Sequence, residues 1–205
     1  MEEKWLSWAK KIQSIAQAGL EYSKDKYDIE RFQQLRQLSK EIMSQYTDLG
    51  EEKIQDLFCN EKGYQTPKVD VRAVVFKDNK ILMAKEIIDG CWSLPGGWAE
   101  VDLSVKENAI KETKEETGMD VEPKRIIAVL DRNKNNPGLC PYGIYKIFVL
   151  CDLKGGNFVK NIETAEMGFF PLSNLPSLSL GRNTREQLEM CFKANYDKNF
   201  QVVFD

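Results

Sequence analysis

The first sixty residues carry apolar side chains at helical spacing. One stripe consists of apolar residues three to five positions apart: Trp5, Trp8, Ile12, Ile15 and Leu20. Two further stripes follow at 29–46 and 54–58, so we expect three amphipathic helices. Three helices alone cannot bury all of their apolar surface. We therefore expect them to pack on a neighbouring part of the protein or on a second copy of the chain. Trp5 and Trp8 suit that interface and the local core equally well.

The pattern changes where Gly63 and Pro67 interrupt the helical spacing. Beyond them, dense β-branched residues predict strands, and the polar segment 77–80 predicts a hairpin turn. The expected strands are 69–76, 81–84, 126–130, 144–150 and 200–204, and the expected helices are 104–117 and 183–195. Strands with dispersed helices predict a mixed α/β sandwich. We therefore divide the chain into a helical domain, 1–65, and an α+β domain, 66–205.

The composition excludes several kinds of chemistry. The 205 residues are 42% hydrophobic and 30% charged, with a formal net charge of −3, so we do not expect a basic nucleic-acid surface. No histidine is present, which excludes histidine bases and zinc sites with histidine ligands. The five cysteines form no CxxC pair, which favours free thiols in the cytoplasm. The pattern predicts neither a signal peptide nor a membrane helix.

A glycine-rich loop precedes the most acidic of the predicted helices. Gly96 and Gly97 would let the backbone approach a ligand closely. Ser104 followed by Glu107 predicts a capping box at the start of the helix, and Gly118 predicts a left-handed cap at its end. The helix therefore begins and ends at positions that the sequence marks by itself.

Two glutamates of this helix lie on one side of it. Glu112 and Glu116 are within about 40° of each other around the helix axis, and like charges so placed repel. Lys111 and Lys114 could compensate on a solvated face. Beside a glycine-rich loop, in a chain without histidine, the paired carboxylates instead indicate a site for a hard divalent cation, Mg²⁺ or Mn²⁺.

The segment 97–119 resembles the Nudix box, a fixed spacing of glycines, glutamates and one arginine. The matching residues are Gly97, Glu112, Glu115, Glu116, Gly118 and Met119. Three positions depart from the pattern, because Leu103 replaces the first glutamate, Lys111 replaces the arginine and Thr113 replaces an apolar residue. Segments outside the box are similar to the Nudix subgroup with an N-terminal helical extension, which includes ADP-ribose pyrophosphatase-like enzymes and CDP-choline pyrophosphatases.

The resemblance implies a fold and a reaction. The fold would be the α+β Nudix sandwich, an α/β/α arrangement with a mixed sheet, behind a small helical domain. The reaction would be Mg²⁺-dependent hydrolysis of the diphosphate bridge of a nucleoside diphosphate linked to another moiety, of the CDP-choline or ADP-ribose type. The products would be a nucleoside monophosphate and a phosphorylated second moiety. We expect a small nucleotide as substrate, a cytoplasmic enzyme, and a homodimer formed through the helical domain.

The resemblance also assigns roles to carboxylates. Glu112 and Glu116 would hold the metal ion. The base would be either a carboxylate, with Glu115, Glu163 and Glu166 as candidates, or metal-bound hydroxide. Because Leu103 cannot bind a metal ion or accept from Lys111, we expect either one metal site fewer or a replacement ligand, Glu100 or Asp102.

Candidates for substrate binding lie outside the helix. Arg72 interrupts an apolar strand, where it either pairs with a buried glutamate or reaches a phosphate or base. Arg132 and Tyr142 flank a loop rich in Asn and Pro, which is typical of a segment that contacts the base or the second moiety. The backbone of Gly96 and Gly97 could orient both the helix and the substrate oxygens.

Two other functions stay open at this point. Leu103 and Lys111 would also fit a catalytically weak Nudix-fold nucleotide sensor, although a pure binder does not need three clustered glutamates. An activity that trims RNA 3′ ends would fit if a short single-stranded end entered the site. The acidic composition argues against nucleic acid as the main partner.

Overall fold

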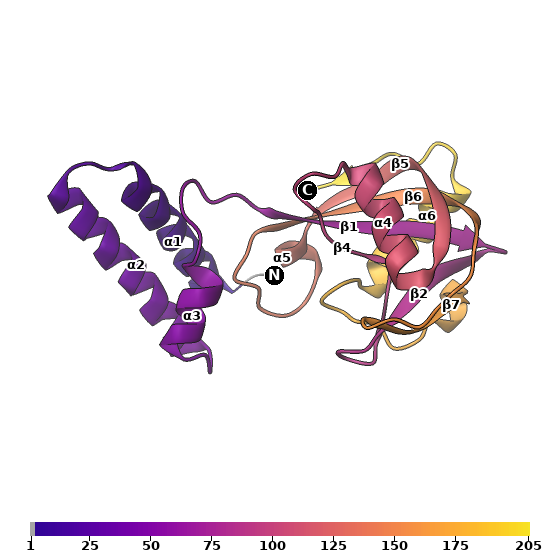
Figure 1. Cartoon of the computed structure of the whole chain (residues 1–205), viewed down its shortest axis with the longest axis horizontal. Coiled ribbons are helices and arrows are strands. Elements are labelled where there is room, and N and C mark those ends of the chain that lie inside the picture. The colour runs from indigo at the N-terminus through magenta and orange to yellow at the C-terminus, as the bar shows by residue number, and fades with distance from the viewer. Residues whose placement is uncertain (1–2) are drawn as a thin grey trace. The chain divides into compact units, whose positions relative to one another are not determined.

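A computed structural model describes residues 3–205 (Figure 1). The chain divides into two compact units: the first contains the chain up to Pro67 together with Leu139–Gly143, and the second contains Lys68–Gly138 and Ile144–Asp205. The predicted boundary lies two residues before this change of unit, and no sequence pattern indicated that the 139–143 segment belongs with the helices. Within residues 3–205, no helix is long and apolar enough to cross a membrane.

The first unit contains the three expected helices. They are α1 (Lys4–Tyr22), α2 (Lys26–Tyr46) and α3 (Glu51–Phe58). Their shared core consists of Leu6, Ala9, Met43, Ile54, Phe58 and Cys59. The ring of Trp5 stacks on that of Tyr46 with 5.0 Å between centroids, whereas Trp8 is 60% exposed. Trp5 therefore belongs to the local core, and Trp8 remains accessible for an interface.

The second unit is built on a mixed sheet. Its strands are β1 (Lys68–Lys77), β2 (Lys80–Glu86), β3 (Trp92–Ser93), β4 (Gly96–Trp98), β5 (Met119–Asp131), β6 (Ile144–Gly156), β7 (Thr164–Phe170) and β8 (Val203–Phe204). The order along the sheet is β3-β2-β1-β6-β5-β8, with β4 paired to β1 and β7 paired to β2. The pairs β1–β6 and β5–β8 are parallel, and the other pairs are antiparallel.

Helices cover both faces of this sheet. The helices are α4 (Val105–Thr117), α5 (Arg132–Asn135) and α6 (Arg185–Tyr196), with a 3-10 turn, η1, at Leu172–Asn174. Side chains alternate along β1, so Val71 and Val75 pack with Ala109 of α4, whereas Val74 packs with Leu188 of α6. This arrangement confirms the predicted α+β sandwich with a mixed sheet.

The structure extends four of the predicted strands, shortens the one predicted at 200–204 to Val203–Phe204, and adds three. In β5, the part before residue 126 alternates buried and exposed residues and carries charges, so it lacks the dense apolar run by which 126–130 was recognised. Strands β3, β4 and β7 were not predicted, since β3 and β4 are too short to show a period. The hairpin between β1 and β2 is confirmed, because Asp78 and Asn79 adopt positive φ angles of 49° and 58°, as a tight hairpin turn requires.

Candidate active site

Both ends of α4 are built as predicted. The hydroxyl of Ser104 accepts from the backbone N–H of Glu107 at 3.3 Å, and the Glu107 carboxylate accepts from the N–H of Ser104 at 2.8 Å. Gly118 has a φ of 71°, and its N–H donates to the carbonyl of Lys114 at 2.9 Å. These caps confirm the capping box and the left-handed glycine cap. They fix the length of the helix that carries the glutamates.

The three box glutamates lie on different sides of α4. Glu112 and Glu116 line a cavity of about 880 Å³ in the second unit. Glu115 does not line it; its side chain is 58% exposed and forms an ion pair with Lys111 at 2.5 Å. The structure therefore brings together the two predicted metal ligands, and it separates Glu115 from them.

Lys111 also explains how the fold accommodates Leu103. The ammonium of Lys111 lies 3.0 Å from the carboxylate of Glu100, and these two neighbouring carboxylates raise the pKa of Lys111. The loop that carries Glu100 is held by Asn108, whose amide accepts from the N–H of Glu100 at 2.9 Å and donates to the carbonyl of Leu103 at 3.1 Å. Glu100 is thus committed to Lys111. Neither it nor Asp102 lines the cavity, so the structure offers no support for them as replacement metal ligands.

The glycine-rich loop sits directly against β1 and α4. Gly96 has a φ of 138°, and a Cβ added there would lie 2.0 Å from the carbonyl oxygen of Val71, so no other residue fits. Its N–H donates to a carboxylate oxygen of Glu116 at 3.0 Å. A Cβ on Gly97 would lie 3.2 Å from a carboxylate oxygen of Glu112. The N–H of Gly96 therefore orients the carboxylate of Glu116 on the helix. Of the two roles expected for this backbone, the N–H of Gly96 serves the helix and not the substrate oxygens.

The cavity glutamates lie in an environment that disfavours their charge. Glu116 is 7% exposed, and burial raises its pKa to about 8, although Arg72 and the N–H of Gly96 partly oppose this. Burial also raises the pKa of Glu112. Within residues 3–205, neither carboxylate forms an ion pair with a lysine or arginine. A cation placed between them would supply the missing compensation.

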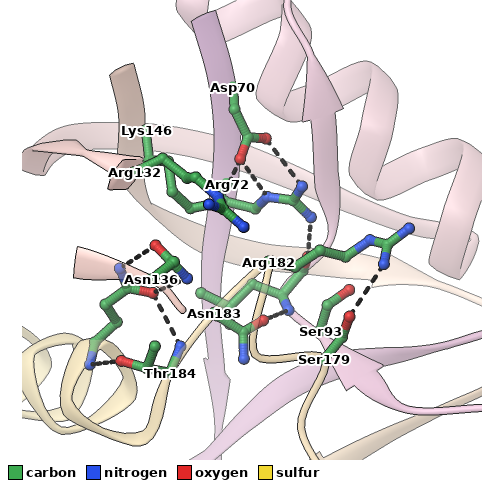
Figure 2. A network of polar contacts seen from close by, with 12 residues as sticks. Asp70, Arg72, Ser93, Arg132, Asn136, Lys146, Ser179, Arg182, Asn183 and Thr184 are labelled. Atoms are coloured by element: carbon green, nitrogen blue, oxygen red, sulfur yellow. Dashed lines mark hydrogen bonds and ion pairs between the residues drawn. The ribbon is translucent and has the colours of Figure 1, made fainter. Parts of the chain in front are cut away.

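The cavity is also lined by positively charged side chains, among them Arg72 and Lys146 (Figure 2). The guanidinium of Arg72 lies 2.9 Å from the carboxylate of Asp70 and donates to the carbonyl of Leu94 at 3.1 Å. The ammonium of Lys146 forms an ion pair with the same carboxylate. Burial alone would raise the pKa of Asp70, but Arg72 and Lys146 outweigh it and the pKa is lowered. Arg72 thus pairs with a buried acid, but the acid is an aspartate and not the glutamate that we expected. Arg72 also lines the cavity.

Three further cavity residues carry charge. Arg182, in the loop before α6, lies 3.1 Å from the carboxylate of Glu86, which also accepts from the hydroxyl of Ser93 at 2.6 Å. Arg132 donates to the carbonyl of Pro137 at 2.8 Å and to that of Gly138 at 2.6 Å. Arg132 therefore braces its own loop while it lines the cavity.

The three base candidates have different surroundings. Glu163 lines the cavity. Its loop is held to α4 by Asn161, which accepts from the N–H of Glu163 at 2.9 Å and donates to the carbonyl of Glu115 at 2.8 Å. Glu166 forms an ion pair with Lys85 at 2.8 Å and does not line the cavity. Of the candidates, the structure brings only Glu163 together with Glu112 and Glu116.

Tyr142 is not part of this cavity. It belongs to the first unit, where its carbonyl oxygen accepts from the ammonium of Lys10 at 3.1 Å. The sequence reasoning missed five charged cavity residues or their partners, which are Asp70, Glu86, Asp89, Lys146 and Arg182. Two of them offered a signal, because Asp70 and Lys146 are charges inside otherwise apolar strands.

The donor set suits a hard cation that keeps part of its water shell. Both cavity glutamates of α4 offer carboxylate oxygens. In the part of the chain from residue 3 to residue 205, no three carboxylates or thiols lie close enough to enclose a metal ion. Mg²⁺ commonly binds through one or two carboxylates, with water and phosphate oxygens completing the shell. The residues present therefore fit a cation that is completed by substrate.

Comparison with known families decides the assignment. A model of the NUDIX domain matches residues 66–190. The chain belongs to the Nudix family. A second model, described as a UDP-X-like N-terminal oligomerisation domain, matches residues 3–58. The Nudix match contains the cavity and α4, and members of the family use divalent cations.

Two relatives match this Nudix protein over both of its parts, and a third matches about two thirds of it. A Bacillus subtilis protein provisionally named ADP-ribose pyrophosphatase is 48% identical over 100% of this chain and 99% of its own length. The crystal structure of a UDP-X diphosphatase covers 100% of both chains at 34% identity, with a TM-score of 0.65. An ADP-ribose pyrophosphatase structure from Streptococcus suis is 51% identical, covers 68% of this chain and 100% of that one, and has a TM-score of 0.64. The chain is therefore a Nudix pyrophosphatase.

Proposed function

We propose that this Nudix pyrophosphatase hydrolyses the diphosphate bridge of ADP-ribose or a closely similar nucleoside diphosphate compound, with Mg²⁺ as its cofactor. The single observation that carries the proposal is a cavity lined by groups of both charges. Glu112 and Glu116 line it without an ion pair to a lysine or arginine in the described residues, and Arg72 and Lys146, both paired with Asp70, line it as well. A diphosphate that brings a divalent cation would interact favourably with both groups at once.

The metal ion would be held by Glu112 and Glu116. When bound, it would supply charge neutralisation of the diphosphate and would favour deprotonation of the attacking water. The N–H of Gly96 holds the carboxylate of Glu116 in place. The relatives' names support this substrate class, since they describe ADP-ribose pyrophosphatases and a UDP-X diphosphatase.

Two residues of the chain would act on the substrate and the attacking water. Arg72 would bind phosphate oxygens that the metal ion does not neutralise, because its buried guanidinium is already oriented by Asp70 and Leu94. Glu163 would accept the proton of a water that adds to one phosphorus. The bond from that phosphorus to the bridging oxygen breaks, and the oxygen leaves with the bonding electrons on the other product. The products are a nucleoside monophosphate and a phosphorylated second moiety.

Product analysis with a substrate panel tests this proposal. The panel contains ADP-ribose, a UDP-sugar, CDP-choline, a dinucleoside polyphosphate and a short RNA, each with and without Mg²⁺. We expect ADP-ribose to give AMP and ribose 5-phosphate, and the reaction to require the metal ion. Release of orthophosphate, turnover of the RNA alone, or turnover that EDTA leaves unchanged would contradict the proposal.

We also propose that residues 1–65 form a dimerisation domain. The match to an oligomerisation domain and the exposure of Trp8 support this. Light scattering of the full chain should report twice the mass of one chain, and Trp8→Lys should lower it. A monomer at micromolar concentration would contradict a homodimer.

A further inference from the structure

One row of side chains crosses three neighbouring strands at one end of the cavity. Strand pairing places Trp98 of β4 beside Asp70 of β1, and Asp70 beside Lys146 of β6. Residues paired across strands point to the same face of a sheet, and all three line the cavity. Since neighbouring strands lie about 4.8 Å apart, the row spans about 10 Å.

The two ends of this row differ in character. Trp98 is 53% exposed, and within residues 3–205 no other ring stacks on it, whereas Trp92 packs edge-on against Phe170 with 4.7 Å between centroids. Lys146 is 1% exposed. Its ammonium has three N–H groups, and in the described part of the chain Asp70 is the one acceptor that it reaches. The row therefore combines an open aromatic surface with a buried donor that has hydrogen-bonding capacity left.

We propose that Trp98 is the surface on which the nucleobase of the substrate stacks, with the Lys146 ammonium at the edge of the base as a hydrogen-bond donor. This inference rests on the proposed function and adds an orientation to it. Aromatic side chains stack on any nucleobase, because every base has a flat π-face. Ring nitrogens and carbonyl oxygens at the edge of a base can accept from an ammonium. The orientation puts the second moiety at the other end of the cavity.

The neighbouring row places the phosphates. The next pairs on the same face are Gly96–Arg72 and Arg72–Phe148, two residues or about 6.6 Å further along β1. A nucleotide whose base lies over Asp70 would then extend its phosphates toward Arg72. Those phosphates would reach the glycine loop that contacts Glu116. The base and the reacting phosphates thus fit one direction along the strands.

The charge of the row argues against a cationic occupant. A tryptophan face can also bind a quaternary ammonium such as choline. Here Arg72 and Lys146 both pair with Asp70, the strand neighbour of Trp98, so this cluster carries two positive charges against one negative charge. A further cation would be repelled, whereas a neutral base would not.

Fluorescence titration of the full-length protein tests the orientation without any turnover. AMP, UMP and CMP are titrated, with ribose 5-phosphate and phosphocholine as ligands that lack a base. We expect at least one nucleotide to quench the tryptophan emission and both ligands without a base to leave it unchanged. Trp98→Phe should lose this quenching, because the remaining tryptophans lie outside the row. Quenching by no nucleotide, or by ribose 5-phosphate or phosphocholine, would overturn the inference.

Affinity of the variants, measured by calorimetry with the tightest of the three nucleotides, separates stacking from structure. Trp98→Leu should weaken binding about tenfold, which is within the range for loss of one base–aromatic stack, and Trp98→Phe should restore most of the affinity. The matched control is Tyr145→Leu, an aromatic residue of similar exposure, 48%, beside Lys146 in sequence but on the other face of β6. Equal affinity in Trp98→Leu and wild type would overturn the inference, as would an equal loss in the control.

Kinetics then tests the same assignment in the reaction. With ADP-ribose, Trp98→Leu should raise KM about tenfold while kcat stays within about twofold, because the ring binds the base in both ground and transition states. A fall in kcat with unchanged KM would overturn the inference. If wild-type protein binds the nucleotide through Trp98 but hydrolyses none of the panel, the proposed function fails and the binding assignment stands.

Discussion

The two sides of α4 carry glutamates in opposite electrostatic settings. On the cavity side, Glu116 is buried and Glu112 is half-buried, and burial raises the pKa of both. On the outer side, Glu115 is exposed and shares Lys111 with Glu100. The members of either pair, Glu112 and Glu116 or Lys111 and Glu115, are four positions apart in the helix. The two sides therefore differ in whether a lysine pairs with the glutamates. Lys111 neutralises the outer side, whereas the cavity side has no such partner and is suited to bind a cation.

The largest effect should come from removing charge on the cavity side. Glu112→Gln or Glu116→Gln keeps the side-chain volume but removes a proposed metal ligand, so kcat for ADP-ribose should fall by about 100-fold or more. Glu115→Gln is the matched control on the outer side of the same helix, and it should stay within about threefold of wild type. Steady-state kinetics at saturating Mg²⁺ measures both. Near-normal turnover in the two cavity variants would place the catalytic centre elsewhere.

The base assignment extends the comparison to the loop before β7. Glu163 lines the cavity, whereas Glu166 is paired with Lys85. Glu163→Gln should lower kcat about 100-fold, the lower end of what general base catalysis contributes, and Glu166→Gln should be almost silent. A rapid-quench measurement of the first turnover shows whether the loss lies in the chemical step. Equal losses in the two variants would mean that Glu163 has no special role.

A smaller effect concerns pH and thermal stability. In the metal-free protein, Glu116 has a pKa near 8 against an ordinary value of 4.5. Its protonated form therefore adds stability below about pH 4.5, and this is lost as the pH rises through 8. Mg²⁺ must displace that proton, so the rise in Tm on adding Mg²⁺ should be several degrees larger at pH 8.5 than at pH 6. Calorimetry should show this difference shrinking in Glu116→Gln. A rise in Tm that is larger at pH 6 would contradict the assignment.

Features that depend on neighbours in sequence were predictable here. The capping box of Ser104 and Glu107 and the cap at Gly118 follow from local backbone geometry, and the structure confirms them. Glu112 and Glu116 share a helix face whatever the rest of the chain does. The spacing of the box indicated the Nudix family, and the family in turn predicted a mixed sheet.

Features that depend on distant segments were not predictable. Asp70 and Lys146 are 76 positions apart, and only the parallel register of β1 and β6 brings them together. The pairing of Lys111 with Glu100 depends on a loop that Asn108 holds in place. Leu103 alone suggested that Lys111 lacks a carboxylate partner at this end of the helix, whereas Glu100 supplies one. Tyr142 was assigned to the substrate because it flanks, with Arg132, a loop rich in Asn and Pro, yet the segment Leu139–Gly143 belongs to the other unit.

Direct measurement of metal binding tests the central claim, that the unpaired side of α4 holds the divalent cation. Mn²⁺ can be titrated into the metal-free wild type, Glu112→Gln, Glu116→Gln and Glu115→Gln, with free Mn²⁺ followed by electron paramagnetic resonance. The account predicts at least about tenfold weaker binding in both cavity variants and unchanged binding in Glu115→Gln. Wild-type affinity in Glu112→Gln and Glu116→Gln, or a loss confined to Glu115→Gln, would contradict it.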